Sequence, residues 1–188
     1  MKKVIIILGI SLSLINNVKA QSTHLDSLKT KSYKSNHFAI GYNINHFGND
    51  FGIGINITSP YFSGSAVAVR ASENYQWLSY VDKTGTNVWG GYHNIRIGLV
   101  GGNFILNKSI RLYGEGGATF LIGNSNFTSK SMAVGGYGLF GFEFYISKGF
   151  SYFIELGGIG TGATADKLPS KPIYSNGFLS SVGFRINL

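Results

Sequence analysis

Residues 131–158 alternate apolar side chains with small or polar ones at every second position, and this pattern limits the possible folds more than any other feature of the sequence. Successive side chains of a β-strand point to opposite faces, so the stretch predicts two strands that each have one apolar face. A short turn at residues 147–149 separates the two arms. Each arm is close to the roughly 9 to 11 residues that a tilted strand needs to cross a bilayer. The pattern therefore predicts a membrane-spanning β-hairpin.

The same alternation recurs from His37 to the end of the chain. It predicts eight strands, at residues 37–45, 51–58, 64–72, 92–106, 110–122, 132–146, 150–157 and 181–188. Short connections are expected near Pro60, Asn107 and Lys148, and long ones at residues 73–91, 123–130 and 161–176; the connection at Asn49 is the only short one on the long-loop side. Short turns at one end and longer loops at the other are typical of transmembrane barrels. The sequence predicts an all-β, eight-stranded antiparallel up-and-down transmembrane β-barrel.

The N-terminal segment has the features of a secretory signal peptide. Two lysines precede an apolar run at residues 4–15, and Val18 and Ala20 stand at the −3 and −1 positions. We expect a signal peptide at residues 1–20, a flexible periplasmic lead-in at 21–36 and an outer-membrane barrel domain at 37–188; an uncleaved anchor is the alternative. The chain has no cysteine, which excludes disulfides and thiolate metal sites.

Alternation alone leaves open which face of the barrel is inside. A soluble, lipocalin-like barrel would turn the apolar face inward. The interior of an eight-stranded barrel is just wide enough to be filled by side chains, and the Phe, Ile and Tyr residues of the apolar faces would overfill it. The other face consists mainly of Gly, Ala, Ser and Asn, whereas soluble surfaces are about a quarter to a third charged. We therefore expect the apolar faces to lie outside.

Charged residues in the predicted strands favour the small-residue face, which would line the lumen. We expect them to form an Arg/Glu network there, because arginine pairs bidentately with carboxylates in enclosed sites. Independent charges in a watery pore are the alternative. The predicted network residues are Arg70, Arg96, Arg111, Glu115, Glu143, Glu155 and Arg185. The predicted interfacial or loop aromatics are Trp77, Tyr80, Trp89 and Tyr92.

The presequence, the eight alternating segments and the C-terminal VGFRINL together resemble the small eight-stranded outer-membrane barrels of Gram-negative bacteria. The resemblance is architectural and covers nearly the whole mature chain. It departs at Leu188, where many such proteins end in phenylalanine. It implies a location in the cell outer membrane with periplasmic N- and C-termini. It also implies a monomer whose partners are outer-membrane lipids, lipopolysaccharide and the barrel-assembly machinery.

The predicted function is that of an integral outer-membrane barrel whose lumen is plugged by side chains. Its role would be structural, or one of surface interaction through extracellular loops with an unknown ligand. A narrow porin for small solutes is the alternative. The chain carries a formal charge of +8, but no basic cluster with stacking aromatics, so nucleic-acid binding is not expected.

No enzymatic activity, cofactor or metal is expected. An outer-membrane lipid hydrolase is the third possibility. The family's deacylases carry a His-x-Ser-Asn run, but here Ile173 precedes Ser175 and Asn176 where the histidine would stand. The phospholipase type has histidine and serine two apart, and His93 is followed by Ile95 at that spacing.

Overall fold

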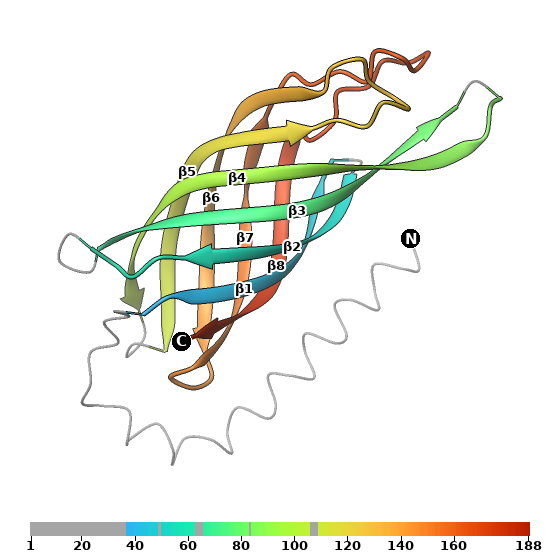
Figure 1. Cartoon of the computed structure of the whole chain (residues 1–188). Helices are drawn as coiled ribbons and strands as arrows, with labels where there is room; N and C mark the ends of the chain where they lie inside the picture. Colours follow the sequence, from blue (N-terminus) through green and yellow to red (C-terminus); the bar gives the residue numbers. More distant parts are fainter. Residues whose placement is uncertain (1–36, 49, 63–65, 83, 106–108) are drawn as a thin grey trace. The chain divides into compact units, whose positions relative to one another are not determined.

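The chain folds into a closed antiparallel barrel in which each strand pairs with the next and the last pairs with the first. The computed structural model describes residues 37–188 except 49, 63–65, 83 and 106–108, so the predicted signal peptide and lead-in lie outside the described residues. The eight strands are β1 (Ala39–Phe47), β2 (Asp50–Thr58), β3 (Val67–Val81), β4 (Asn87–Ile105), β5 (Ile110–Ile122), β6 (Met132–Tyr145), β7 (Phe150–Gly160) and β8 (Gly177–Asn187). The predicted eight-stranded up-and-down barrel is confirmed (Figure 1).

The register of the strands sets the tilt of the barrel wall. Following paired residues from Ile110 around all eight strands returns to β5 at Phe120, ten residues further along. A stagger of this size goes with a tilt of roughly 35 to 45°. The Leu188 amide donates to the Phe38 carbonyl at 2.9 Å. Both ends of the described barrel therefore lie at the same rim as the β2–β3, β4–β5 and β6–β7 connections.

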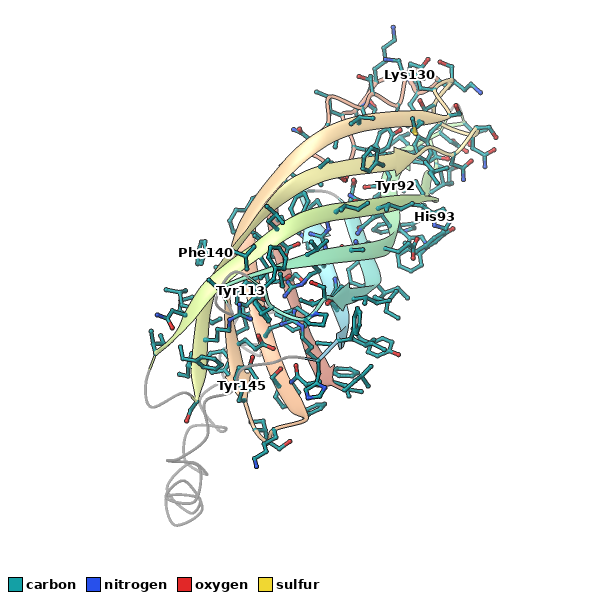
Figure 2. The ribbon with its side chains drawn as sticks, turned by 60° about the vertical axis from the view of Figure 1, so that its left-hand side comes forward. Tyr92, His93, Tyr113, Lys130, Phe140 and Tyr145 are labelled. Atoms are coloured by element: carbon teal, nitrogen blue, oxygen red, sulfur yellow. The ribbon has the colours of Figure 1, made fainter. Side chains whose placement is uncertain are left out.

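The two faces of each strand are sorted as the alternation predicts, with the apolar parity outside. Leu99 and Phe140 are 57% and 48% exposed, whereas Tyr113 and Arg70 are each 2% exposed. Figure 2 shows Phe140 pointing away from the wall. The outward apolar face and the buried polar interior contradict a lipocalin-like arrangement. No helix among the described residues is long and apolar enough to span a membrane.

The long connection expected at residues 73–91 is not a loop, and that prediction is wrong. β3 and β4 stay paired from Val67↔Gly101 to Val81↔Asn87, and only residues 82–86 connect them. Alternation continues through this region, but its inward residues are amides such as Asn74 and Gln76 in place of small side chains. Glu73 adds to the irregularity because it is a charged residue on the outward face.

The β3–β4 hairpin extends beyond its neighbouring strands. β2 pairs with β3 only as far as Leu78, and β5 pairs with β4 only as far as His93. The remaining two-stranded section projects from the long-loop rim (Figure 1). Its outward side chains include Val81 and Trp89, which are 48% and 63% exposed. The region expected to be an irregular loop is thus a projecting β-ribbon.

Candidate functional site: the barrel lumen and its outer cap

The seven charged residues predicted for the lumen are all buried inside the barrel, between 2% and 6% exposed except Glu143 at 1%. They come from six strands, β3 to β8, at positions whose neighbours in sequence face outward. Taking such charges out of water is unfavourable unless each finds a partner and further hydrogen bonds. The contacts below show which of them do.

Arg70 is the centre of the middle layer of the lumen. Its Nη1 lies 2.6 Å from Glu115 Oε2 and 3.0 Å from Glu155 Oε1. Its Nε donates to Thr58 Oγ1 at 2.9 Å. The hydroxyls of Tyr113 and Tyr137 donate to Glu155 at 2.6 Å and to Glu115 at 2.7 Å. One guanidinium thus joins two carboxylates from different strands, each of which also accepts a tyrosine.

A second group of charges lies toward the short-turn rim. Arg185 Nη1 lies 2.8 Å from Glu143 Oε1, which also accepts the Ser151 hydroxyl at 2.7 Å. Arg111 Nη1 is 3.9 Å from Glu143 Oε2, and it donates to the Tyr61 hydroxyl. Arg185 Nη2 is also 3.9 Å from Glu155 Oε1. This last approach links the lower group to the Arg70 layer.

Arg96 is the predicted network residue that the structure does not bring to a carboxylate. Among the described residues, no carboxylate lies within ion-pair distance of it. Its Nη2 is 3.5 Å from Asn74 Oδ1, and its guanidinium lies over the Tyr137 ring at 5.3 Å. Its Nε and Nη1 are buried without a hydrogen-bond partner in the described chain. Arg96 therefore belongs to a different, uncharged environment.

That environment is a layer of amides above the charges, which the sequence analysis missed. Asn43 and Asn45 both donate to Asn74 Oδ1, at 3.2 and 2.7 Å. Gln76 donates to Asn45 Oδ1, and Thr119 donates to Asn94 Oδ1 at 2.9 Å. Asn74, Gln76, Asn94 and Thr119 share the parity of the arginines in their strands, and Asn43 and Asn45 lie on the small-residue face of β1. That shared parity was the available signal. Inward glycines of β2 make room for the layer: Gly52 and Gly54 lie against the side chains of Gln76 and Asn74.

A hydrophobic cap covers the amide layer at the long-loop rim. Its buried residues come from the barrel mouth and from the β5–β6 and β7–β8 connections, and they are Leu78, Tyr92, Leu121, Phe127, Ala163, Ala165, Leu168 and Tyr174. The Tyr174 ring packs against Tyr92 and Phe127 at centroid distances of 5.0 and 5.2 Å. Such aromatic pairs stabilise beyond their buried area. The two loops are therefore packed onto the barrel mouth.

Polar contacts anchor this cap to the barrel wall. Asp50 Oδ2 accepts the Tyr92 hydroxyl at 2.5 Å and the Ser175 amide at 2.6 Å. Asn94 Nδ2 donates to Ser175 Oγ at 2.6 Å. Asp50 thus holds the end of the β7–β8 loop against β2 and β4.

The two loops also bond to each other. The Ser129 amide donates to Asp166 Oδ1 at 2.7 Å, and the Ser129 hydroxyl donates to the other carboxylate oxygen. These bonds lower the pKa of Asp166 from its usual 3.8 to about 2. Lys167 contributes twice, through its amide to the Phe127 carbonyl at 3.1 Å and through Nζ to the Ser125 carbonyl at 2.7 Å.

The four aromatics predicted at interfaces or in loops occupy different environments. Trp77 stacks on Phe51 on the outer wall, with ring centroids 5.9 Å apart, and Trp89 is exposed on the projecting ribbon. Tyr80 packs against Phe127 at the cap. Tyr92 differs from the prediction, because it is 1% exposed within the cap. Its position has inward parity, next to the outward His93 (Figure 2).

The described polar groups of the lumen bond mainly to one another. A cavity of about 10 Å³ lies near Arg111, Glu143 and Arg185 at the short-turn rim, too small for a substrate. No cluster of potential metal ligands occurs among the described residues. Ser175 bonds to Asn94, and His93 pairs with Glu73 on the outer wall. The described contacts therefore include no serine–histidine pair.

Two solved structures share this fold at low sequence identity. The N-terminal β-barrel domain of OprF from Pseudomonas aeruginosa is 14% identical, over 82% of this chain and 98% of that chain, with a TM-score of 0.53. The outer membrane protein OprG from Pseudomonas aeruginosa is 10% identical, over 82% and 97% of the two chains, with a TM-score of 0.59.

No protein-family model and no curated protein matches the chain. The likeness to the two solved structures therefore concerns the fold alone. Together with the closed register and the outward apolar face, it gives a consistent architecture. The chain has the fold of the small eight-stranded outer-membrane β-barrels.

Proposed function

We propose that this protein is an integral outer-membrane barrel with a closed lumen that presents its cap and projecting ribbon at the cell surface. The observation that carries the proposal is the Arg70 centre, which ties β3 to β5 and β7 across the lumen. These ion pairs place bonded side chains across the interior of the barrel. The proposed role is structural or one of surface interaction, with no enzymatic activity.

The cap and the ribbon are the surfaces that the proposal assigns to interaction. Packed loops present a fixed surface, which reduces the entropy lost when a partner binds. The ribbon adds an exposed tryptophan, Trp89, and tryptophan is enriched among residues that dominate binding energy. Both features lie at the same rim, and the partner that they would contact is an extracellular one.

A narrow pore is the second candidate, and the environment of Arg96 favours it. Two nitrogens of Arg96, together with Asn43 Oδ1 and Gln76 Oε1, are buried without a partner in the described chain. Buried polar groups of this kind are commonly satisfied by water. A hydrated amide layer would be the upper part of a water path, and the Arg70 layer would then be its barrier.

Cysteine labelling tests the proposed location and orientation, because the chain has no cysteine of its own. Ser125→Cys lies in the cap loop and Lys148→Cys in the β6–β7 turn, and both positions are exposed. A membrane-impermeant maleimide should label Ser125→Cys on intact cells. It should label Lys148→Cys only after the outer membrane is opened. Labelling of Lys148→Cys alone on intact cells would reverse the orientation, and equal labelling of both in the soluble fraction would reject a membrane location.

A further inference from the structure

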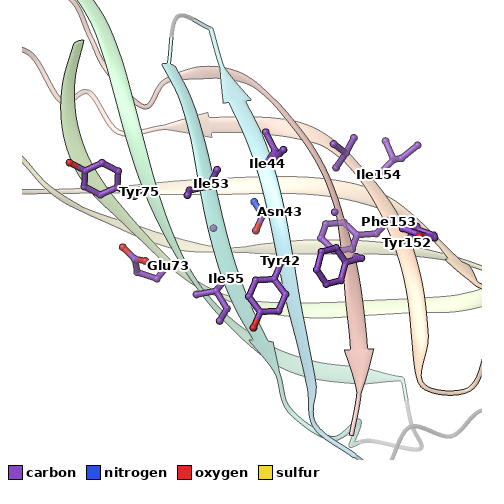
Figure 3. A pocket seen from close by; sticks show the side chains of 14 residues that line it. Tyr42, Asn43, Ile44, Ile53, Ile55, Glu73, Tyr75, Tyr152, Phe153 and Ile154 are labelled. Atoms are coloured by element: carbon purple, nitrogen blue, oxygen red, sulfur yellow. The ribbon is translucent and has the colours of Figure 1, made fainter. Parts of the chain in front are cut away.

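An apolar groove crosses the outer wall of the barrel from β7 through β8, β1 and β2 to β3. Its volume is about 820 Å³, within the roughly 300 to 1,000 Å³ of small-molecule sites. Its sides include Ile44, Ile53, Tyr152 and Ile154 (Figure 3). Gly183 and Phe153 also line the groove. The groove therefore has the dimensions and the lining of a site for hydrocarbon.

One end of this groove carries a carboxylate. Glu73 lines the groove beside Tyr75, and the paired positions on the adjacent strands are Ile55 and Ile95. Of the Asp, Glu, Lys and Arg side chains in the eight described strands, Glu73 is the only one on the outward face. Charges on the lipid face of a membrane barrel are unfavourable in proportion to their depth. A carboxylate on this apolar face therefore needs a compensating partner.

His93 supplies only part of that partnership. Its Nδ1 lies 2.7 Å from Glu73 Oε1, and its ring packs edge-on against Tyr75 at 5.1 Å. The side chains of Glu73 and His93 remain 46% and 49% exposed. The carboxylate can therefore accept a further hydrogen bond from a group that lies in the groove.

We propose that the groove binds a membrane phospholipid with an ammonium head group, its acyl chain along the apolar walls and its ammonium against Glu73. Charge complementarity selects the head group, because a carboxylate attracts an ammonium and repels an anionic head. The apolar lining selects the tail. The proposal rests on the membrane location proposed above and adds a lipid specificity to it.

Native mass spectrometry of the purified full-length protein tests the proposal. The barrel is reconstituted with equal amounts of phosphatidylethanolamine and phosphatidylglycerol of identical acyl chains. The lipid that stays bound to the released protein is then identified by its mass. The unmodified protein should retain phosphatidylethanolamine about fivefold over phosphatidylglycerol, the size of a partly exposed charge interaction. Glu73→Gln should remove this preference and still retain lipid.

Two tryptophan variants separate the groove from the rest of the wall. Ile44→Trp fills the groove and should abolish retention of both lipids. Leu112→Trp is the matched control, because Leu112 is an outward residue of β5, outside the groove, and retention should be unchanged. Heat-dependent gel mobility shows that each variant is a folded barrel before lipids are weighed.

Several results would overturn the proposal. They are retention of no lipid, equal retention of both lipids, preference for phosphatidylglycerol, a preference that survives Glu73→Gln, or a dimer released in place of a lipid complex. Cysteine labelling on cells tests the proposed membrane location separately, because its outcome does not depend on which lipid the protein retains.

Discussion

A single buried charge in the lumen compensates more than one opposite charge. Arg70 is 2% exposed and compensates two carboxylates. In such a site, loss of the cation leaves buried negative charge behind, which is the costly event. The tyrosines that donate to the same carboxylates cannot replace a positive charge. The stability of the barrel should therefore respond sharply to this one side chain.

Removal of Arg70 is the first test at this scale. Arg70→Met should lower the free energy of unfolding in detergent by about 3 to 5 kcal/mol, because Glu115 and Glu155 lose their shared cation. The double variant Arg70→Met, Glu115→Gln should lose less free energy of unfolding than the sum of the losses in the two single variants. Thermal unfolding followed by circular dichroism measures all three variants. Ile97→Ala, on the outward face, is the control and should add independently to Arg70→Met.

The Asp166 contact gives a pH-dependent prediction. The folded pKa of about 2 lies below the usual 3.8, so the ionised carboxylate stabilises the loop contact above pH 3.8. This stabilisation should disappear as the pH falls from 3.8 toward 2. Hydrogen exchange at the Ser129 amide, which donates to Asp166, should accelerate over that interval. Asp166→Asn should show no acceleration there, and a change centred near neutral pH in the unmodified protein would contradict this account.

The sequence predicted which face of the barrel wall each lumen charge occupies, but not the residue with which it pairs. Parity alone placed Arg70, Glu115 and Glu155 on the inward side, since alternation is a local property. Pairing depends on strand stagger, which no local pattern records. Arg96 illustrates the consequence, because it has the same parity and type as Arg70 but meets amides and an aromatic ring.

At the scale of elements, the cap is the feature that alternation could not foresee. The β5–β6 and β7–β8 connections lack period-two patterning, yet they bury Phe127 and Leu168 over the barrel mouth. Their order comes from packing and from hydrogen bonds between residues far apart in the chain. The prediction of a loop in place of the β3–β4 ribbon was wrong for another reason. The inward positions of this region carry polar amides in place of small residues, so the alternation was not recognised as that of paired strands.

Removal of the central aromatic ring tests the cap. Phe127 is fully buried against Tyr80, Tyr92 and Tyr174, so Phe127→Ala should weaken the cap by about 3 to 5 kcal/mol. Hydrogen exchange should rise in the two loops and stay unchanged in the barrel strands. Phe140→Ala, which removes an outward ring, is the control and should leave loop exchange unchanged. Uniform loosening of the barrel by Phe127→Ala would show that the cap is not a separate unit.

At the scale of the whole molecule, closure, tilt and filling act together. The ten-residue stagger closes eight strands into a barrel of small interior. That interior holds charges below, amides above and the apolar cap at the mouth, together with buried apolar side chains such as Val100 and Leu139. The outward apolar face could be predicted from the interior volume and from the low charge of the opposite face, and this prediction is confirmed. The layering could not, because it arises only when all eight strands are in register.

Single-channel conductance of the purified protein in a planar bilayer tests the closed lumen most directly. Because Arg70 joins Glu115 and Glu155 across the barrel and the cap covers its mouth, the unmodified protein should show no steady open conductance. Heat-dependent gel mobility shows that the protein in the same preparation is a folded barrel. A steady, ohmic open state in the unmodified protein would contradict the closed lumen and establish a pore with solvated walls.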